Sequence, residues 1–595
     1  MFNSVTCSLK VHCNEKDRHT LLNFKLGITD PSGMLSSWLT QQDCCQWTGV
    51  KCDNITGRVT DLNLPCHADE ELHCLTGELN LSLLQLDFLS YLDLSNNALW
   101  GIQHEFRNSS NLHFLDLSYN YDLLIDNLHW LSRLSSLQYL HLSGIDLHKE
   151  TNWLQSVTML PSLLELHLES CQLQNIYPSI HYANFTTLQV LDLADNHFLS
   201  DEFPSWLFNL SCDISIIDLS QNKIHGQLSK MLLNIKSIKS LILSYNALNG
   251  PIPNWIGQLE QLQELDLSLN SFSGPIPTSL GNLSSLIVLN LELNDLNGNL
   301  PENVGKLFNL EALTVAGNSL TGIVSERNLL SLSKLYYLSL GSPDLIFGFD
   351  SEWAPPFQLH ILKLVYVGGK LPSWLFTQSS LRDLTIQEST ASFEPLEKFW
   401  NFATQLEFLS LTYNSINGDM SNVMLNSKVA WLNSNNLTGG LPRVSPNVVV
   451  LNLANNSLSG SISPLLCHNM TEKSNLKMLA VGKNLLSGEL TDCWNNWESL
   501  IEVGLESNSL TGKIPHSMSS LSNLMSLHLS RNNLFGEIPL SLKNCKNLLM
   551  VDLSYNNFSG AVPSWMGQSL EALQLRSNQF SGNIPPQICQ LNSLM

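Results

Sequence analysis

The sequence has few basic residues and no long apolar run. The first feature argues against a nucleic-acid partner, and the second argues against a membrane-spanning segment within this chain. Its 595 residues include 30 lysines and arginines against 52 aspartates and glutamates, which gives a formal net charge of −22. An acidic surface repels phosphate backbones and anionic lipid, so we expect no nucleic-acid partner. No apolar run reaches about 18 residues, so any attachment to a membrane would come through a segment absent from this chain.

Sequence signatures of catalysis are also missing. The chain contains no Gly-rich phosphate loop, no Gly-x-Ser-x-Gly elbow, no His-Glu-x-x-His helix and no protein-kinase signature. Its carboxylates recur at a regular spacing, which indicates solvated columns rather than a poised acid–base pair. We therefore expect no enzyme activity, no cofactor and no metal site.

What the chain contains instead is one phrase, Leu-x-x-Leu-x-Leu-x-x-Asn-x-Leu, repeated along almost its whole length. The phrase recurs about 22 times with a period near 24 residues, with clean copies beginning at Ile238, Leu262 and Leu524. A unit this short cannot bury its own core, so successive copies must stack on one another. The sequence therefore predicts an α/β-type solenoid: a right-handed leucine-rich-repeat superhelix whose parallel strands form a concave sheet.

The asparagine of the phrase is expected to be buried at the turn after each strand, where its amide can bond backbone groups of adjacent coils. Most repeats keep it, from Asn97 to Asn578. Cys171 takes this position in one repeat. Its thiol can act as a weak hydrogen-bond donor in place of the amide. The other repeats that lack the asparagine carry His67, Ile145, Pro343, Val367 or Ser389 there.

Three of these replacements are consecutive, at Pro343, Val367 and Ser389, and the stretch SPDLIFGFDSEWAPPFQL is inserted nearby. A local change of curvature or a protruding loop is expected there, and such irregularity is either a binding region or sequence drift. The chain also ends just after a new repeat opens at Leu594, which indicates a fragment. We expect these segments: 1–12, a remnant of a signal or leader; 13–53, an N-terminal cap; 58–341, the first part of the array; 342–460, an irregular part; and 461–595, a truncated last part.

The first four cysteines of the cap region are Cys13, Cys44, Cys45 and Cys52, and they allow three pairings. We favour Cys13–Cys44 with Cys45–Cys52, because adjacent cysteines rarely bond each other; metal binding is the alternative. Between them, a short helix from Glu15 to Lys25 is expected to cover the first coil with Leu21, Leu22, Phe24 and Leu26.

Two further cysteine pairs are expected. Cys66 and Cys74 can form a disulfide within an inserted loop, or ligate zinc together with His67 and His73. Cys467 and Cys493 lie about one repeat apart, so they should reach each other on neighbouring coils.

Cysteine usage and sequons indicate an oxidising, extracellular environment. Candidate glycosylation sites are Asn54, Asn80, Asn108, Asn184, Asn209, Asn282, Asn436, Asn455, Asn469 and Asn557. The repeat phrase itself generates some of these sequons by chance.

Two outward columns of the predicted sheet carry the candidate binding residues. The position six residues before the conserved asparagine gives the aromatic residues Tyr91, Phe114 and Tyr139, then Tyr337 and Phe408. A second outward column lies two residues later in each repeat. In the first half of the chain its residues are mostly acidic or histidine, and in the irregular segment 342–460 they include Lys363 and Trp431. Exposed aromatics beside charge are typical anchors of protein interfaces, whereas the acidic column belongs to a Leu-Asp-Leu-Ser consensus and can simply solvate the sheet. We expect a protein or peptide ligand at seven of these outward positions: Tyr91, Phe114, Tyr139, Tyr337, Lys363, Phe408 and Trp431.

The segment CNEKDRHTLLNFKLGITDPSGMLSSW, followed by CCQWTGVKC, resembles the N-terminal cap of plant leucine-rich-repeat proteins. Residues 128–173, WAPPFQL at 353–359 and LSGELTDCW at 486–494 resemble receptor-like proteins of the ethylene-inducing-xylanase receptor group. This resemblance covers nearly the whole chain. It implies an immune receptor at the extracellular side of the plasma membrane, without a kinase domain, that recognises a microbial protein or peptide elicitor and signals through partner receptor kinases.

The chain departs from that group because it lacks a convincing signal peptide, the island insertion with the final repeats, and the membrane helix. Two other functions therefore stay open. One is a soluble apoplastic inhibitor of cell-wall-degrading enzymes, although such inhibitors are much shorter, and the other is the ectodomain of a peptide-hormone receptor.

Overall fold

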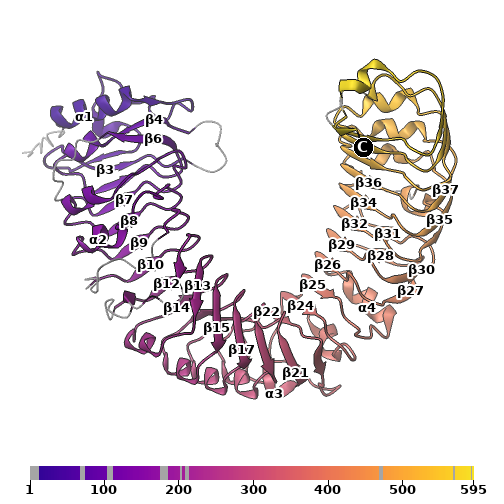
Figure 1. Ribbon diagram of the computed structural model, residues 1–595, viewed down its shortest axis with the longest axis horizontal. Coiled ribbons are helices and arrows are strands. Elements are labelled where there is room, and N and C mark those ends of the chain that lie inside the picture. Colours follow the sequence, from indigo (N-terminus) through magenta and orange to yellow (C-terminus); the bar gives the residue numbers. More distant parts are fainter. Residues whose placement is uncertain are drawn as a thin grey trace, which may run out of the picture. The chain divides into compact units, whose positions relative to one another are not determined.

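The computed structural model describes residues 12–66, 74–103, 111–174, 185, 187–200, 204, 206–207, 213–467, 473–566, 570–590 and 593–594. The chain forms two compact units, residues 1–296 and residues 297–595. Each unit is a stack of leucine-rich-repeat coils, as the repeat predicts, and each coil contributes one short strand to a long sheet (Figure 1).

The long sheet of the first unit is parallel except where β2 meets β3 antiparallel. Its strands are β2 (Val50–Cys52), β3 (Val59–Asn63), β5 (Tyr91–Asp93), β7 (Phe114–Asp116), β8 (Tyr139–His141), β9 (Glu165–His167), β10 (Val190–Asp192), β12 (Ile216–Asp218), β14 (Ser240–Ile242), β16 (Glu264–Asp266) and β18 (Val288–Asn290).

The long sheet of the second unit is parallel throughout. Its strands are β20 (Ala312–Thr314), β22 (Tyr337–Leu340), β24 (Ile361–Val365), β25 (Asp383–Gln387), β26 (Phe408–Ser410), β29 (Val429–Trp431), β32 (Val450–Asn452), β34 (Met478–Ala480), β36 (Glu502–Gly504), β38 (Ser526–His528), β40 (Met550–Asp552), β42 (Ala572–Gln574) and β44 (Ser593–Leu594).

Short strands beyond the turn of each coil form smaller outer sheets. They are β1 (Ile28–Thr29), β4 (Thr76–Asn80), β6 (Ala98–Gln103), β11 (Leu199–Ser200), β13 (Lys223–Gly226), β15 (Ala247–Pro251), β17 (Ser271–Pro275), β19 (Asp295–Gly298), β21 (Ser319–Val324), β23 (Asp344–Phe347), β27 (Asn417–Asp419), β28 (Met424–Leu425), β30 (Asn436–Thr438), β31 (Arg443–Val444), β33 (Ser459–Gly460), β35 (Leu485–Glu489), β37 (Ser509–Thr511), β39 (Phe535–Gly536), β41 (Asn557–Gly560) and β43 (Gln579–Phe580).

Helical turns close the coils. The α-helices are α1 (Glu15–Leu26), α2 (Trp153–Thr158), α3 (Glu326–Leu329), α4 (Leu396–Ala403) and α5 (Ser463–Leu466). The 3₁₀ turns are η1 (Cys44–Gln46), η3 (Leu81–Gln85), η4 (His129–Arg133), η6 (Lys230–Asn234), η7 (Asn254–Gln258), η8 (Thr278–Asn282), η9 (Glu302–Lys306), η10 (Ser373–Thr377), η11 (Trp494–Asn496), η12 (His516–Ser520), η13 (Leu540–Asn544) and η14 (Pro586–Gln590). Among the described residues, no helix is both long and apolar enough to cross a membrane.

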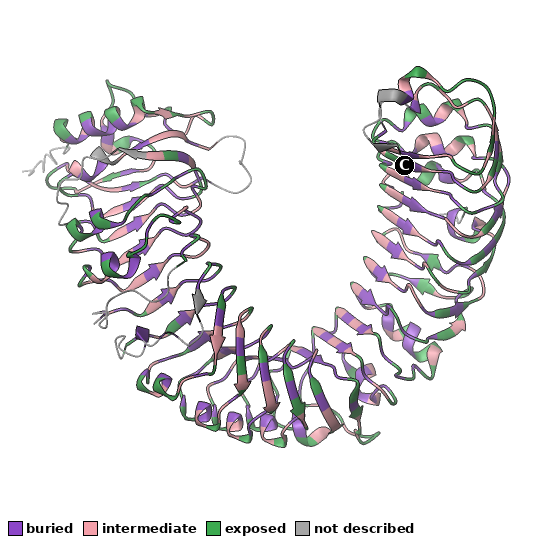
Figure 2. Cartoon of the chain, viewed as in Figure 1, coloured by how far each residue is buried: buried purple, intermediate pink, exposed green. Residues whose placement is uncertain are grey.

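Burial alternates along many strands of the long sheets, because successive side chains of a strand point to opposite faces, although some strands, such as β20, are buried throughout (Figure 2). In β5, Leu92 is fully buried, as is Leu94 just after it, whereas Tyr91 and Asp93 are half-buried and face outward. Each fully buried leucine stabilises the stack by about 1.5–3 kcal/mol. We call the outward side of the long sheet in each unit its open face.

The conserved asparagine is buried or half-buried and bonds adjacent coils, as the sequence predicts. In Asn97 the Nδ2 atom donates to the carbonyls of Leu64, Leu94 and Ser95, at 2.9, 3.0 and 3.2 Å, and Oδ1 accepts from the Leu75 N–H at 3.0 Å. Leu64 and Leu75 belong to the preceding coil, so one amide ties two coils together.

The residue before the asparagine adopts a left-handed backbone conformation that only a tight turn requires. Examples are Asn96, Tyr119 and Leu269, with φ of 57°, 57° and 53°. Non-glycine residues rarely adopt such angles, so the asparagine bonds that hold the turn offset a local strain. Before Ile145, which lacks the amide, the same position is Gly144 with φ of 76°, where a glycine carries no such cost.

The residues that replace the asparagine make the contacts that their own side chains allow. The Cys171 thiol donates to the Leu142 carbonyl at 3.2 Å, as expected of a weak donor. The Ser389 hydroxyl accepts from the Val367 N–H at 3.0 Å and donates to the Gln387 carbonyl at 2.8 Å. Val367 fills its position as a buried apolar side chain. His67 lies outside the described residues.

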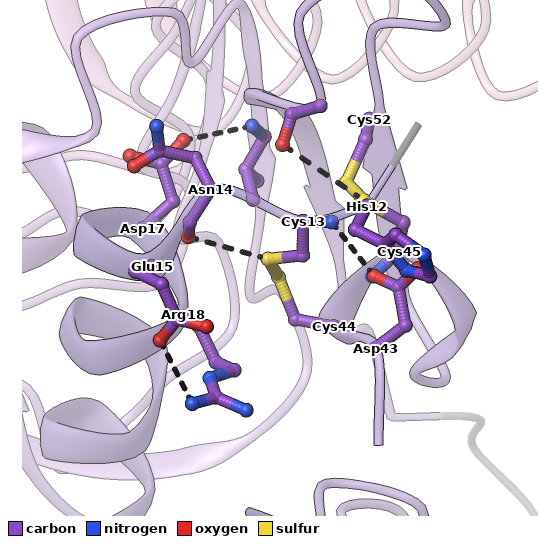
Figure 3. The surroundings of a disulfide bond; sticks show 12 residues. His12, Cys13, Asn14, Glu15, Asp17, Arg18, Asp43, Cys44, Cys45 and Cys52 are labelled. Atoms are coloured by element: carbon purple, nitrogen blue, oxygen red, sulfur yellow. Dashed lines mark hydrogen bonds and ion pairs between the residues drawn. A yellow bond between two sulfur atoms is a disulfide. The ribbon is translucent and has the colours of Figure 1, made fainter. Parts of the chain in front are cut away.

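The N-terminal cap is closed by two disulfides and is joined to the first coil by an ion pair. Cys13 bonds Cys44 and Cys45 bonds Cys52, which are the favoured pairs, and the helix α1 begins beside them (Figure 3). The Asp17 carboxylate is fully buried and accepts from Arg58 Nε at 2.8 Å and Nη2 at 3.0 Å.

The expected packing of the cap helix is only partly right. Leu21 and Phe24 are fully buried, but Leu26 is 86% exposed and Leu22 is half-buried. The two aromatic residues Trp38 and Trp47 fill the remaining space, with ring centroids 5.2 Å apart.

The other expected disulfides also form. Cys66 bonds Cys74, and Cys467 bonds Cys493 across neighbouring coils with Cα atoms 5.3 Å apart. The sulfurs of the first six cysteines from Cys13 onward are therefore not free to ligate zinc. Among the described cysteines, Cys171 and Cys545 are unpaired and buried.

The inserted stretch after Pro343 packs onto its neighbours instead of protruding. Phe349 and Trp353 stack with centroids 5.3 Å apart, and both meet the edge of Trp374, at 5.7 and 6.3 Å. Trp374 is only 3% exposed, so the insertion buries it. The helix α4 then replaces the usual 3₁₀ turn, and the outer sheet of β21 and β23 gives way to isolated bridges at residues 346, 368, 370 and 392.

Candidate ligand-binding surface

The open face of the first unit carries three aromatic rings in contact. The register of β5, β7 and β8 places Tyr91 beside Phe114 and Phe114 beside Tyr139. Tyr91 and Phe114 stack with centroids 4.3 Å apart and an interplanar angle of 7°, and Phe114 meets Tyr139 at 5.9 Å. Burial in this stack, with the nearby charge of Asp93, raises the pKa of Tyr91 to about 12.

Beside these rings runs a row of histidines and carboxylates, contributed by the consecutive strands β7, β8, β9 and β10. We call it the histidine–carboxylate row, and it consists of Asp116, His141, Glu165, His167 and Asp192. The Nδ1 atom of His141 lies 3.4 Å from Asp116 Oδ2, and the Nδ1 atom of His167 lies 3.2 Å from Asp192 Oδ2. Between the two rings, Glu165 Oε2 lies 3.9 Å from His141 Nε2 and 3.6 Å from His167 Nε2.

The electrostatics of the row follow from these contacts. Partial burial alone would raise the pKa of Asp116, but the bonds from His141 and Ser118 outweigh it and hold that pKa below its ordinary value. Burial would likewise lower the pKa of His167, but the bond and charge of Asp192 and the charge of Glu165 raise it. The neighbouring side chains thus favour the charged forms of Asp116 and His167.

One strand further, Asp218 has no histidine partner. Burial raises the pKa of Asp218 to about 6, with the charges of Asp192 and Glu169 adding to the effect against the bonds from Ser220. An ionised Asp218 at neutral pH is therefore an unfavourable feature of the folded state.

The aspartates at the outward position of Asp116 also stabilise the turn after each strand. One carboxylate oxygen of Asp116, Asp218 and Asp266 accepts the backbone N–H two residues later, at 2.8, 2.8 and 2.9 Å. This contact supports the consensus interpretation, in which the acid closes the turn after the strand. In Asp116 and Asp192 the second oxygen, Oδ2, contacts the neighbouring histidine.

In the second unit, the predicted residues lie on the open face of β22 to β29 and are all half-buried. The ammonium of Lys363 lies 5.4 Å from the centre of the Tyr337 ring. Phe408 is on β26 and Trp431 on the adjacent β29, where Ser410 pairs with Trp431. The structure thus brings Tyr337 together with Lys363, and it places Phe408 and Trp431 on neighbouring strands.

Away from the open face, the same unit has a hollow next to the helix α4. Its wall includes Leu396, Trp400, Asp419 and Met424, and its volume is about 420 Å³. It is an open depression between α4 and the short strands β27 and β28.

The sequons differ in accessibility. Those with exposed asparagines are Asn54, Asn282, Asn436, Asn455 and Asn557, and Asn80 is half-buried. Asn108, Asn184, Asn209 and Asn469 lie outside the described residues. Glycosylation at any of them stays a prediction.

The sequence-based search missed Glu165, although a signal for it existed. Glu165 stands six residues before Cys171, in the same outward column as Tyr139. His141 and His167 stand two positions after this column, where the sequence by itself predicts only a row that is acidic or histidine. What links them is the register of β8 and β9, which pairs His141 with His167.

Comparison with known proteins agrees with this architecture. A leucine-rich-repeat N-terminal domain matches residues 14–53, and leucine-rich repeats match at 187–210, 237–259, 261–283, 447–469, 523–545 and 569–591. The chain is 26% identical to the ectodomain of the receptor kinase GASSHO1/SCHENGEN3 from Arabidopsis thaliana, solved with CASPARIAN STRIP INTEGRITY FACTOR 2, covering 97% of this chain and 72% of that one, with a TM-score of 0.72. It is 27% identical to the Arabidopsis receptor kinase HAESA, solved with the peptide hormone IDA and the co-receptor SERK1, covering 96% and 99%, with a TM-score of 0.61.

The curated relatives are more specific. The chain is 37% identical to tomato (Solanum lycopersicum) receptor-like protein EIX1 over 37% of its own length and 25% of that relative's. It is 36% identical to tomato receptor-like protein EIX2, and this match covers 98% of the chain and 70% of EIX2. The chain therefore belongs to the plant leucine-rich-repeat receptor-like proteins, the family of EIX1 and EIX2.

Proposed function

We propose that this chain is the ligand-binding ectodomain of a cell-surface immune receptor that recognises a microbial protein or peptide elicitor. The observation that carries the proposal is the 36% identity to receptor-like protein EIX2 over 98% of the chain. Recognition, and not catalysis, is the proposed activity. The chain acts at the extracellular side of the plasma membrane, or in the apoplast if it is secreted.

The open face of the second unit supplies the proposed contacts. Trp431, Phe408 and Tyr337 are half-buried aromatics, and partly exposed rings of this kind are frequent hot spots of protein interfaces. Lys363 adds the positive charge that an otherwise acidic surface lacks. An acidic or amphipathic stretch of the elicitor fits this combination.

Signalling is proposed to pass through partner receptor kinases. This step rests on the family resemblance, and it is supported by the fold shared with HAESA, whose structure holds a co-receptor together with the peptide hormone.

A second candidate function is the recognition of an endogenous peptide hormone. It is favoured by the similarity to GASSHO1/SCHENGEN3 and HAESA, each of which was solved with a plant peptide or protein factor bound. A hormone would use the same open face, so the ligand and not the surface separates the two candidates.

The proposal is tested by titrating the purified, secreted chain, captured on a biosensor, with a catalytically inactivated ethylene-inducing xylanase as the microbial probe. The IDA peptide is the matched hormone probe. Saturable binding of the xylanase but not of the peptide supports the immune function. Binding of the peptide alone favours the second candidate, and binding of neither contradicts recognition of these two ligand classes.

The contribution of the open face is tested with the double variant Phe408→Ala/Trp431→Ala. Removal of two anchors should weaken binding of the responding probe by about 10-fold or more, since interface hot spots are each worth about 2 kcal/mol or more. Phe535→Ala is the matched control, because Phe535 is an exposed ring on the outer strand β39. Unchanged affinity in the double variant would remove β26 and β29 from the binding surface.

A further inference from the structure

We propose that His141, Glu165 and His167 form a zinc site on the open face of the first unit. The inference is independent of the proposed function. It assigns to this part of the sheet a metal ion that the sequence-based reading did not expect.

The backbone brings the three residues together. His141 on β8 and His167 on β9 are paired in a parallel register, so their side chains leave the same face of adjacent strands. Glu165 precedes His167 by two residues on β9, which puts its side chain on that same face. All three residues therefore lie within one small patch of the sheet.

The distances between the donor atoms suit a tetrahedral metal ion. One ligand atom from each of the three residues lies within 4.8 Å of the other two. Glu165 Oε2 is 3.6 Å from His167 Nε2 and 3.9 Å from His141 Nε2. Ligands at about 2.0–2.1 Å from a tetrahedral zinc ion are about 3.4 Å apart, so small rotations of the side chains close the site.

The remaining ring nitrogens are oriented as in known zinc sites. Zinc-bound histidines usually donate their other N–H to a carboxylate, which fixes the tautomer and the orientation of the ring. Here Asp116 Oδ2 lies 3.4 Å from His141 Nδ1, and Asp192 Oδ2 accepts from His167 Nδ1 at 3.2 Å. With both Nδ1 atoms protonated, both Nε2 lone pairs are free to ligate on the side of Glu165.

One nitrogen of the group lacks a hydrogen-bond partner within the part of the chain that the structure describes. The Nε2 atom of His141 is buried, and it has no hydrogen-bond partner among the described residues. A buried nitrogen without a partner is costly, so a ligand at this point stabilises the fold. Two histidines with one carboxylate are a ligand set typical of zinc, and it leaves a fourth position for water or for a donor from a bound partner.

The test uses the secreted, disulfide-bonded chain without an oligohistidine tag, treated with EDTA and then dialysed free of it. Titration with zinc chloride in a calorimeter should show one tight site per chain. Titration with cobalt(II) should give the absorption bands of a tetrahedral complex. An absence of saturable zinc binding would overturn the proposal and leave the row as paired charges only.

Variants locate the ion. His141→Gln and His167→Gln should each abolish the tight site, and Asp192→Asn should weaken it by about 10–100-fold, since partners of metal ligands typically contribute that much. His528→Gln is the matched control, because His528 holds the same strand position on β38 and bonds Ser526. It should bind zinc as the unsubstituted chain does.

Equal binding by His141→Gln, His167→Gln and the control would place the ion elsewhere and refute the site. If either histidine variant loses its folded circular-dichroism spectrum, Glu165→Gln replaces it, since Glu165 is only half-buried. Zinc should raise the unfolding temperature of the unsubstituted chain and of His528→Gln, and it should leave that of the ligand variants unchanged.

Discussion

The same strand positions serve two regions of the molecule differently. On β5 to β12 the outward side chains engage one another, as the stack of Tyr91 on Phe114 and the histidine–carboxylate row show. On β22 to β29 the candidate binding residues are half-buried as well, and a contact between Lys363 and Tyr337 joins two of them. The same strand positions can therefore carry one surface whose side chains largely contact one another and another whose rings and charge are better placed for a partner.

The interiors of the two regions differ as well. Near β7 the turn is tied by the amide of Asn120, whose Nδ2 donates to the Leu94 and Leu117 carbonyls at 3.0 and 2.8 Å. Near β25 the same position is Ser389, with a single hydroxyl. Of these two turns, the one at Asn120 is thus held by more buried side-chain bonds than the one at Ser389.

The largest expected effect follows from this interior difference. Asn120→Ala leaves several buried backbone groups without partners and should lower the free energy of unfolding by about 3–5 kcal/mol. Ser389→Ala removes two bonds and should cost about 1–3 kcal/mol. Urea denaturation followed by circular dichroism measures both, and equal losses would show that the two interiors are held alike.

A smaller change, an increase in the free energy of unfolding, is expected when Asp218 is replaced by asparagine. Its pKa is raised to about 6 in the folded chain, from an ordinary value of 3.8, so ionising it opposes folding. The stability lost through this group appears as the pH rises from about 4 to 7. Asp218→Asn should therefore stabilise the chain by about 1–2 kcal/mol at pH 7 and by almost nothing at pH 4.

The control for this substitution is Asp552→Asn. Asp552 also accepts the N–H two residues later, at 3.0 Å, but its neighbours in the sheet are His528 and Gln574. A gain at pH 7 that matches that of Asp218→Asn would mean that neither the burial of Asp218 nor its acidic neighbours cause the effect.

The smallest expected change in stability concerns the aromatic rings of the two open faces. Phe114→Leu breaks the stack with Tyr91 and should cost about 0.5–1.5 kcal/mol more than Phe408→Leu. Thermal unfolding of both variants makes the comparison. A larger loss for Phe408→Leu would show that the second region satisfies its own surface as fully as the first.

Most of the fold was predictable because it depends on spacing. The recurrence of leucines set the buried positions such as Leu92 and Leu94, and the asparagine column set the turns. The cysteine pairs followed from the length of one coil and from the unlikely bonding of adjacent cysteines. Each of these arguments uses only local geometry and a fixed repeat.

Features that depend on contacts between coils were not predictable. The exposure of Leu26 and the packing of Phe349 and Trp353 on Trp374 depend on which coil surface lies opposite. The histidine–carboxylate row required the register of β8 with β9, where His141 and His167 pair although the helix α2 intervenes in the sequence. The ligand-binding residues stay predictions, because surface chemistry narrows the partner without naming it.

The most direct test of the account is hydroxyl-radical footprinting of the chain with and without the elicitor that binds in the titration. If the partner binds the open face, Tyr337, Phe408 and Trp431 should lose reactivity in the complex. Phe308 and Phe535, which are 52% and 43% exposed, lie outside the strands of the long sheet and should react equally in both states. Protection of Phe308 or Phe535, with Phe408 and Trp431 still reactive, would contradict binding on the open face.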